Sequence, residues 1–205
     1  MSLPASHRPR RRFAAAAAVL ATLALLVGCS SDKLVDDYKA GTNKGYISGD
    51  GALETFVGDS LGEPVTFAGP TESGDTFDST DALGSVVVVN FWYASCPPCR
   101  AEAEDLEALS QKFAGDGVQF VGVNVRDEAG TAASFAETFG VTYPSIIDNA
   151  TADVQLAFSD SIQPNAVPTT LVLDPKGRVV ARILGQVTEP SILGTIIREN
   201  VDAAQ

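Results

Sequence analysis

The hydrophobic residues of this chain follow two patterns, which predict two kinds of secondary structure. Residues 85–93 (SVVVVNFWY) and 118–125 (VQFVGVNV) are nearly continuous runs of β-branched and aromatic residues. Such runs, without polar alternation, are typical of strands that are buried on both faces of a sheet. Residues 100–113 instead place Leu106 and Leu109 at helical spacing among acidic residues, which predicts an amphipathic helix.

Shorter signals predict the remaining elements. Residues 64–69 and 75–80 are expected to form a hairpin around a glycine-containing turn. Further along the chain we expect short helices at 131–140 and 151–158, a short strand at 144–148, a second hairpin made of 169–174 and 178–184, and a last helix at 189–200. The predicted order is β-β, then β-α-β-α-β-α, then β-β-α, which is an α/β arrangement.

The first 28 residues have the layout of an export signal. Arginines within residues 8–12 precede an uninterrupted apolar run at residues 13–28, which is short for a membrane span of roughly 20 residues. The run ends at Leu-Val-Gly-Cys, with the cysteine at position 29, and this resembles a bacterial lipobox. In that motif the cysteine is acylated, so Cys29 is the expected lipidation site and first mature residue. An ordinary export signal and a short membrane anchor are the alternatives.

These signals divide the chain into a lipoprotein signal peptide at 1–28, a flexible tether at 29–51 and a folded domain at 52–205. The tether is polar, contains several glycines and lacks apolar periodicity. Acylation of Cys29 would hold the protein at the extracytoplasmic face of the bacterial cell membrane by a lipid anchor. Disulfides persist in that compartment.

Charge and composition argue against several classes of function. The formal net charge is −12, and residues 29–205 carry all 26 acidic residues against 10 basic ones. Such a surface repels phosphate backbones, so we expect no nucleic-acid partner. The only histidine, His7, and the only methionine, Met1, lie in the predicted signal. A zinc site, a haem-attachment motif and a histidine-dependent triad therefore lack essential residues, and we expect no metal and no cofactor.

The candidate chemistry lies in FWYASCPPCRAE at residues 91–102, which contains Cys96 and Cys99. The pair falls where a predicted strand ends and a predicted helix begins. Unpaired N–H groups and the positive end of the helix dipole stabilise a thiolate at such a position. Because the thiolate is the attacking species, this position favours Cys96 as the nucleophile. Pro97 and Pro98 lack N–H groups and suit a first helical turn.

Disulfide exchange is the favoured interpretation of this pair. Cys99, one turn further into the helix, is expected to be less accessible and to resolve a mixed disulfide. A soft-metal site completed by carboxylates is one alternative. A purely structural disulfide is another, although a loop of two residues would stabilise little.

Three stretches resemble the thioredoxin superfamily, and more narrowly its exported TlpA/ResA/DsbE-like branch of thiol–disulfide oxidoreductases. They are VVVVNFWYASCPPCRAE, FGVTYPSIID and AVPTTLVLDPKGRVV, and the likeness covers about residues 57–200. The resemblance implies a thioredoxin-like fold, with a central mixed β-sheet flanked by helices. An N-terminal β-hairpin would extend this fold, and a helix and a strand would be inserted between its βαβ and ββα halves. It also implies that Cys96 and Cys99 form the redox-active disulfide.

The resemblance assigns roles to further residues. Pro168 matches a proline that follows a cis peptide bond and lies against the disulfide, and Val167 would present its backbone to a substrate. Asn90 takes the place where thioredoxins have a buried aspartate. Glu102 matches an acidic residue one turn after the second cysteine, where a carboxylate could accept the proton of Cys99. The alternative for Glu102 is a solvated helix face, because several acidic residues follow it.

The residue before the first cysteine departs from the family pattern. The family commonly has tryptophan there, whereas this chain has Ser95, which could cap the helix. Ser95, Pro97, Val167 and Trp92 are the expected substrate contacts. Trp92, the only tryptophan, also lies near enough to report on the disulfide, and core packing is its alternative role.

The resemblance implies a reductase of disulfides in exported proteins, including the cysteines of apocytochrome c. Its electrons would come from a membrane thiol carrier of the CcdA/DsbD type. A disulfide-forming oxidant of the same fold and a non-catalytic redox-sensing or binding lipoprotein are the alternatives. A thiol peroxidase is disfavoured, because its pattern requires Pro and Thr where this chain has Val89 and Tyr93.

Overall fold

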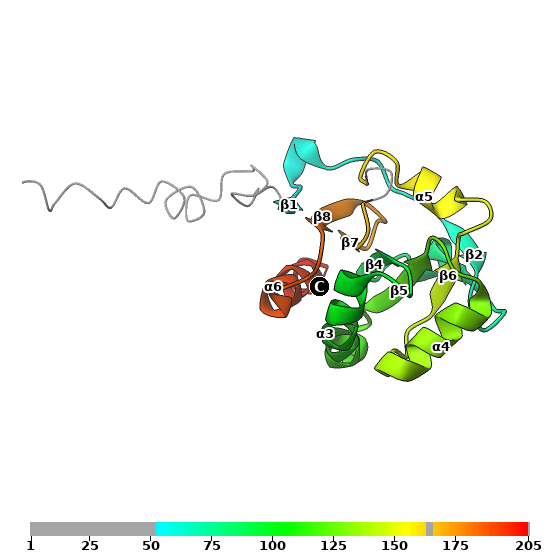
Figure 1. Ribbon diagram of the computed structural model, residues 1–205. Helices are drawn as coiled ribbons and strands as arrows, with labels where there is room; N and C mark the ends of the chain where they lie inside the picture. The colour runs from blue at the N-terminus through cyan, green and yellow to red at the C-terminus, as the bar shows by residue number, and fades with distance from the viewer. Residues whose placement is uncertain (1–51, 163–165, 205) are drawn as a thin grey trace, which may run out of the picture. The chain divides into compact units, whose positions relative to one another are not determined.

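A six-stranded mixed sheet forms the centre of the computed structural model, which describes residues 52–162 and 166–204. Its strand order is β1-β8-β7-β4-β5-β6 (Figure 1). The neighbours β4, β5 and β6 run parallel, whereas β7 is antiparallel to β4, and β8 is antiparallel to both β7 and β1. The strands are β1 (Leu53–Thr55), β4 (Val87–Trp92), β5 (Gln119–Asn124), β6 (Ser145–Ile147), β7 (Thr169–Leu173) and β8 (Val179–Leu184).

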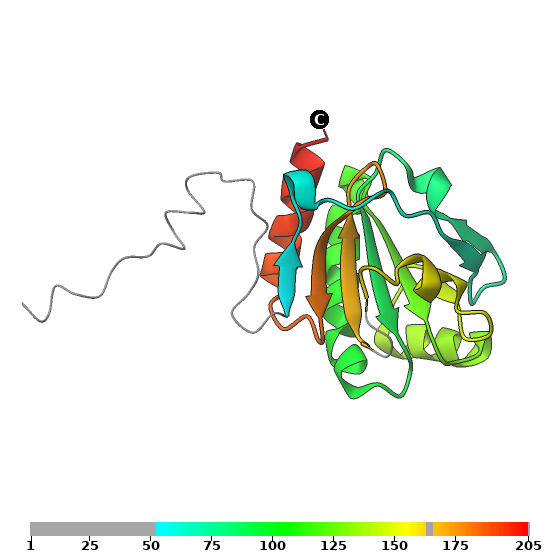
Figure 2. The ribbon, with the colours of Figure 1, turned by 90° about the horizontal axis from the view of Figure 1, so that it is seen from above.

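The helices cover both faces of this sheet because β4 is apolar on both sides. Val88 packs in a core with residues of α3 (Pro97–Phe113) and α6 (Pro190–Asp202). Val89 points to the opposite face and packs in a core that includes Val154 of α5 (Asp153–Ala157). Figures 1 and 2 show α3, α6 and α4 (Ala129–Phe139) on one face and α5 on the other.

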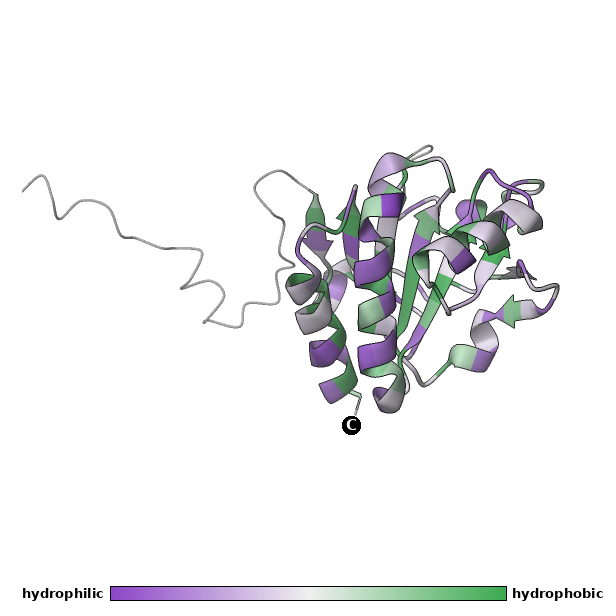
Figure 3. Cartoon of the chain, turned by 60° about the horizontal axis from the view of Figure 1, so that its bottom comes forward, coloured by the Kyte–Doolittle hydropathy of each residue, from purple (hydrophilic) through white to green (hydrophobic). Residues whose placement is uncertain are grey.

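The helices are amphipathic, as the spacing of their apolar residues predicts. The buried residues of α3 are Cys99, Glu102, Ala103, Leu106, Leu109 and Phe113, which recur every three or four positions. Figure 3 shows strands made mostly of hydrophobic residues behind helices that contain both hydrophilic and hydrophobic residues. The one charged residue in this buried row of α3 is Glu102.

The predicted order of elements is confirmed, with one addition. The expected N-terminal hairpin is a separate two-stranded sheet of β2 (Ala68–Pro70) and β3 (Thr76–Asp78). Strand β1 was not predicted, because it has three residues without alternation and is defined by pairing with β8. Three short 3-10 helices complete the described elements: η1 (Gly58–Ser60), η2 (Ser79–Ala82) and η3 (Ala114–Asp116).

The predicted signal peptide at 1–28 and the tether at 29–51 lie outside the described residues, and so does Cys29. Within residues 52–162 and 166–204, no helix is both long enough and apolar enough to cross a membrane. Anchoring through a lipid on Cys29 therefore stays a prediction.

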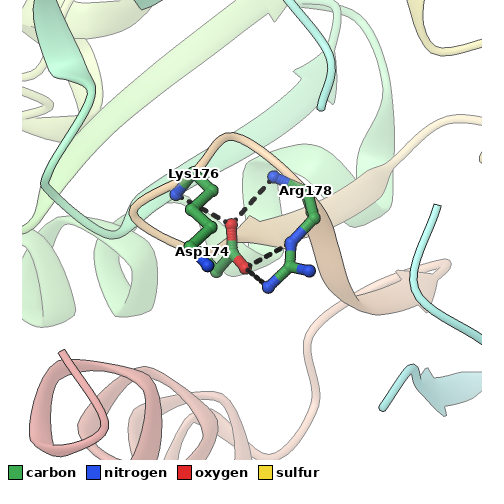
Figure 4. Close-up of polar contacts among 3 residues, drawn as sticks. All are labelled: Asp174, Lys176 and Arg178. Atoms are coloured by element: carbon green, nitrogen blue, oxygen red, sulfur yellow. Dashed lines mark hydrogen bonds and ion pairs between the residues drawn. The ribbon is translucent and has the colours of Figure 1, made fainter. Parts of the chain in front are cut away.

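One buried carboxylate organises the turn between β7 and β8. Asp174 Oδ1 accepts hydrogen bonds from the backbone N–H groups of Lys176 and Arg178, both at 2.9 Å. Its Oδ2 accepts from the Arg178 guanidinium, at 2.8 Å from Nε and 2.6 Å from Nη2 (Figure 4). This turn follows Leu173, which pairs with Val87 at the start of β4. It therefore lies at the other end of β4 from the cysteine pair.

Candidate active site

A disulfide joins Cys96 and Cys99 at the start of α3, just after β4. Cys96 is the N-cap residue, and its Sγ accepts a hydrogen bond from the Cys99 N–H at 3.2 Å. Pro97 and Pro98 form the first two helical positions and have no N–H, so the Cys99 N–H is the first donor of the helix. This donor and the helix dipole favour negative charge on the Cys96 sulfur.

The cap at Cys96 shows that the prediction of Ser95 as the capping residue is wrong. The helix begins at Pro97, so Ser95 lies one position too early for its side chain to serve as the cap. The Cys96 N–H donates instead to the Tyr93 carbonyl at 3.2 Å, which forms a tight turn between strand and helix. Ser95 and Pro97 are both exposed, as a role in contacting substrate requires.

Both cysteines are almost completely covered in this disulfide form. Cys96 is 1% exposed and Cys99 is 3% exposed, so the prediction that Cys99 is the less accessible of the two is wrong for this form. Apolar residues from β4, α3 and α4 pack around the pair, and Val167 lies against the same cluster. The two cysteines differ in their relation to the helix, because only Cys96 occupies the cap.

The expected cis proline is present. The Val167–Pro168 peptide bond is cis, and Val167 packs against the cluster that contains both cysteines. Pro168 directly precedes β7, whose first residue, Thr169, pairs with Phe91 near the end of β4. Two segments about 70 residues apart in the sequence therefore meet at the disulfide.

Trp92 is 5% exposed in this disulfide form, and its contact with substrate stays a prediction. Its Nε1 donates to Ser145 Oγ at 3.2 Å, and its ring centre lies 4.3 Å from that of Phe135. Core packing, the alternative role, is what the structure shows. Trp92 shares a cluster with both cysteines, so its fluorescence remains suited to reporting on the disulfide.

Glu102 is 0% exposed, which shows that the alternative of a solvated face is wrong. Its Oε1 accepts from Asn90 Nδ2 at 2.9 Å, and its Oε2 accepts from the Val187 N–H at 2.7 Å. Asn90 Nδ2 also donates to Thr170 Oγ1 at 3.1 Å. Asn90 thus lies buried between β7 and α3, in the position that the resemblance implied.

The environment of Glu102 suits proton exchange. None of the ion pairs among the described residues involves Glu102. Burial raises the pKa of Glu102 to about 7, and the hydrogen bonds from Val187 and Asn90 act in the opposite direction. A carboxyl group with a pKa near neutrality can both accept and release a proton at the pH of most cell compartments.

A cavity of about 10 Å³ lies beside Cys99, and its wall also includes Asn90, Tyr143 and Ser145. That volume suits about one water molecule. Desolvation raises the pKa of Tyr143 above its usual value, with the charge of Glu102 adding to the effect, so its hydroxyl stays protonated. Asn90 belongs both to the cavity wall and to the hydrogen bond with Glu102. Asn90 therefore contacts Glu102 and shares the wall of this cavity with Cys99.

Sequence reasoning missed three contributors to the site. Asp127 Oδ2 accepts from the Ala94 N–H at 2.6 Å and from Asn124 Nδ2 at 2.9 Å, and so fixes the loop before the disulfide. Its place could have been inferred, because it follows β5 and the carboxyl ends of adjacent parallel strands share one edge of a sheet. Thr170 and the Val187 N–H carry no such signal, since their role depends on distant residues.

Comparison with protein families and curated proteins gives matches that agree with this geometry. The family model described as Redoxin matches residues 56–197. The chain is 31% identical over 120 residues to the thiol-disulfide oxidoreductase ResA of Bacillus subtilis, and this match covers 58% of this chain and 64% of ResA. It is 32% identical over 130 residues to the thiol:disulfide interchange protein HelX of Rhodobacter capsulatus, covering 63% and 66%. The chain thus spans slightly less than two thirds of these relatives.

Solved structures show the same fold. A secreted thiol-disulfide isomerase from Corynebacterium glutamicum superposes with a TM-score of 0.66 at 28% identity, covering 77% of this chain and 96% of that one. A thioredoxin family protein from Chlorobium tepidum, described as a thiol:disulfide interchange protein, has a TM-score of 0.64 at 28% identity, covering 71% and 99%. The predicted thioredoxin-like fold is confirmed.

Proposed function

This chain belongs to the Redoxin family, and on that premise we propose that it is an extracytoplasmic thiol–disulfide oxidoreductase that reduces disulfides in exported proteins. One observation carries the proposal: the Cys96–Cys99 disulfide caps helix α3, with the Cys99 N–H directed at the Cys96 sulfur. The names of the relatives support the same class of reaction.

The first step belongs to Cys96 of the reduced protein. Its thiolate, stabilised by the helix cap, attacks one sulfur of a substrate disulfide. A bond forms between Cys96 Sγ and that sulfur while the S–S bond of the substrate breaks. The other substrate sulfur leaves as a thiolate and takes a proton from solvent, and the protein is left in a mixed disulfide with its substrate.

The second step belongs to Cys99 and Glu102. The Cys99 thiol gives its proton to the Glu102 carboxylate, which lies one helical turn further along α3, and the resulting thiolate attacks Cys96 Sγ. The intramolecular disulfide forms, the mixed disulfide breaks, and the second substrate sulfur leaves as a thiolate that is then protonated. Two electrons have moved from the protein dithiol to the substrate. An external dithiol must return them, and the resemblance suggests a membrane thiol carrier of the CcdA/DsbD type.

The proposed location is the extracytoplasmic face of the bacterial cell membrane, with a lipid on Cys29 as anchor. The lipobox-like sequence supports it, and the similar protein from C. glutamicum is described as secreted. Substrates would be exported proteins with disulfides, for which apocytochrome c is the example that the resemblance suggests. When cells are fractionated, the Cys29→Ala protein should be lost from the membrane fraction and keep its activity. An unchanged amount of this variant in the membrane fraction would identify residues 13–28 as the anchor.

Turnover of insulin disulfides by the full-length protein, with dithiothreitol as the electron source, tests the reaction. Cys96→Ser should abolish turnover, because no nucleophile remains at the cap. Cys99→Ser should accumulate a mixed disulfide with the substrate, because attack is intact and resolution is lost. Equal trapping by both variants would contradict the assigned roles, and an inactive wild-type protein would contradict the function.

The direction of the reaction is tested by the reduction potential of the Cys96–Cys99 couple. Equilibration with glutathione buffers, followed by thiol alkylation and mass spectrometry, measures it. A couple more reducing than glutathione supports a reductase, whereas a strongly oxidising couple supports the disulfide-forming alternative.

A further inference from the structure

Among the residues that the structure describes, two arginines that form no ion pair lie beside the disulfide. The described residues include seven lysines and arginines against 22 aspartates and glutamates. Three of the seven form ion pairs, namely Arg178, Arg182 and Arg198. Of the other four, Arg100 and Arg126 both contact the loop at residues 93–95, immediately before Cys96. The other two, Lys112 and Lys176, lie at the last turn of α3 and in the β7–β8 turn.

Both guanidinium groups are held in place by this loop or by the neighbouring helix. The Arg126 Cζ lies 4.1 Å from the centre of the Tyr93 ring. Arg100 Nη1 donates to the Ala94 carbonyl at 3.3 Å, and its Cζ lies 4.9 Å from the centre of the Phe139 ring. Both arginines are exposed. A guanidinium that stacks on a ring keeps the N–H groups at its edge available for a carboxylate.

The carboxylates near these arginines have other partners or form no ion pair with them. Asp127 accepts from the Ala94 N–H and from Asn124. Glu128 accepts from Asn149 Nδ2. Glu104 follows Arg100 by one helical turn, yet the ion pairs of the described residues do not include one between them. Within the described part of this acidic domain, the edge of the site next to Cys96 thus offers positive charge that forms no ion pair.

We propose that Arg100 and Arg126 select partners that carry aspartate or glutamate next to the cysteine that Cys96 attacks. The inference rests on the proposed function, because it concerns the substrate of the same disulfide. A carboxylate would meet guanidinium groups that are already oriented by stacking, so little side-chain freedom is lost on binding. At physiological salt this attraction acts over about 8 Å, and acidic residues further away on the domain are screened.

Three peptides test the selection. Each contains two cysteines joined in a disulfide, and they differ only in the residues that flank the cysteines, which are Asp, Asn or Lys. Each rate with the wild-type protein is divided by the rate of the same peptide with dithiothreitol alone, which removes the effect of the flanks on the disulfide itself. The Asp peptide should exceed the Asn peptide by about fivefold, and the Lys peptide should be slowest. The ratio of the normalised rates of the Asp and Asn peptides should approach one at about 1 M salt, where the Debye length is about 3 Å.

The variants assign the selection to these two residues. In the double variant Arg100→Gln/Arg126→Gln, the ratio of the Asp to the Asn peptide should fall to about one. Lys112→Gln/Lys176→Gln is the matched control, because it changes the net charge equally through two exposed residues away from the disulfide. This control should keep the wild-type ratio.

Two outcomes would overturn the inference while leaving the proposed function intact. One is an equal normalised rate of the wild-type protein for all three peptides. The other is that the arginine variant reduces all three peptides and the small neutral compound bis(2-hydroxyethyl) disulfide more slowly than the wild-type protein by the same factor. The arginines would then act on the cysteine pair and not on the partner. Failure of the wild-type protein to reduce any of these disulfides would contradict the proposed function itself.

Discussion

Two buried carboxyl groups lie at opposite ends of β4 and β7, and the fold surrounds them differently. Glu102, next to the disulfide, is 0% exposed and accepts two hydrogen bonds from neutral donors, Asn90 and the Val187 N–H. Asp174, in the β7–β8 turn, is 7% exposed and accepts two backbone N–H groups together with the guanidinium of Arg178 (Figure 4). Both groups are well hydrogen-bonded, but a cation accompanies only Asp174.

The difference shows that the same fold uses one buried carboxyl group, Asp174, for structure and another, Glu102, for chemistry. A cation beside a buried carboxylate offsets the cost of removing its charge from water. Asp174 therefore serves to close a turn. Without a cation, desolvation outweighs the two hydrogen bonds, and the pKa of Glu102 rises to about 7. Glu102 can therefore change its protonation state during a reaction.

The largest expected effect is on the pH dependence of stability. The ordinary pKa of a glutamate is 4.5, whereas the pKa of Glu102 in the folded protein is about 7. As the pH rises, the unfolded chain therefore loses the Glu102 proton at a lower pH than the folded protein does. The free energy of unfolding should then fall as the pH rises from about 4.5 to about 7, by up to about 3 kcal/mol, and change no further above that range. Urea unfolding of the oxidised protein at several pH values measures it.

Glu102→Gln should lack this component, so the difference in stability between wild type and variant should change across the same pH range. Glu104→Gln is the matched control, because Glu104 is an exposed residue of the same helix. Parallel profiles for the wild-type protein and Glu102→Gln would contradict the raised pKa.

The next effect is on the rate of resolution. Glu102→Gln should slow the attack of Cys99 on the mixed disulfide by about 100-fold, because the proton acceptor is lost, and should slow the initial attack by Cys96 less. In the wild-type protein this rate should rise with pH up to about 7, as Glu102 becomes the carboxylate. Stopped-flow fluorescence of Trp92 follows both steps. If Glu102→Gln and Glu104→Gln give the same rates and pH profile, Glu102 takes no part in resolution.

Substitutions around Asp174, at the opposite end of the sheet, should change the stability of the protein and leave its turnover unchanged. Arg178→Gln leaves Asp174 buried without its cation and should lower the free energy of unfolding by about 2 kcal/mol, less than for a fully buried pair because Arg178 is partly exposed. Lys176→Gln is the control, because the hydrogen bond from Lys176 to Asp174 comes from the backbone N–H, which the substitution keeps. Thermal unfolding measures the stability of each variant, and reduction of insulin measures its turnover. A variant at Arg178 that kept its stability and lost its turnover would contradict the comparison.

The smallest expected effect comes from removing one neutral donor. Asn90→Ala should cost about 1 kcal/mol of stability. Because the hydrogen bond from Asn90 lowers the pKa of Glu102, its loss should move the pH dependence of resolution upward. Thr170→Val removes the other partner of Asn90 and should leave that pH dependence in place. A shift to lower pH in Asn90→Ala would show that Asn90 does not stabilise the carboxylate.

The sequence by itself determined the features that depend on neighbouring residues. The apolar runs at 85–93 and 118–125 form β4 and β5, because their side chains must be buried on both faces. The spacing of Leu106 and Leu109 defines the buried side of α3. The cysteine pair and its prolines mark the junction of strand and helix, since proline fits a first helical turn.

The tertiary structure decided the features that depend on distant residues. Three-residue β1 exists because β8 pairs with it, and the cap lies on Cys96 and not on Ser95 because α3 begins at Pro97. Glu102 stands among acidic residues in the sequence, and its pKa depends on burial and on the N–H of Val187, 85 positions away. Local propensity is set by a few adjacent residues, whereas desolvation and pKa are set by whatever the fold packs around a group.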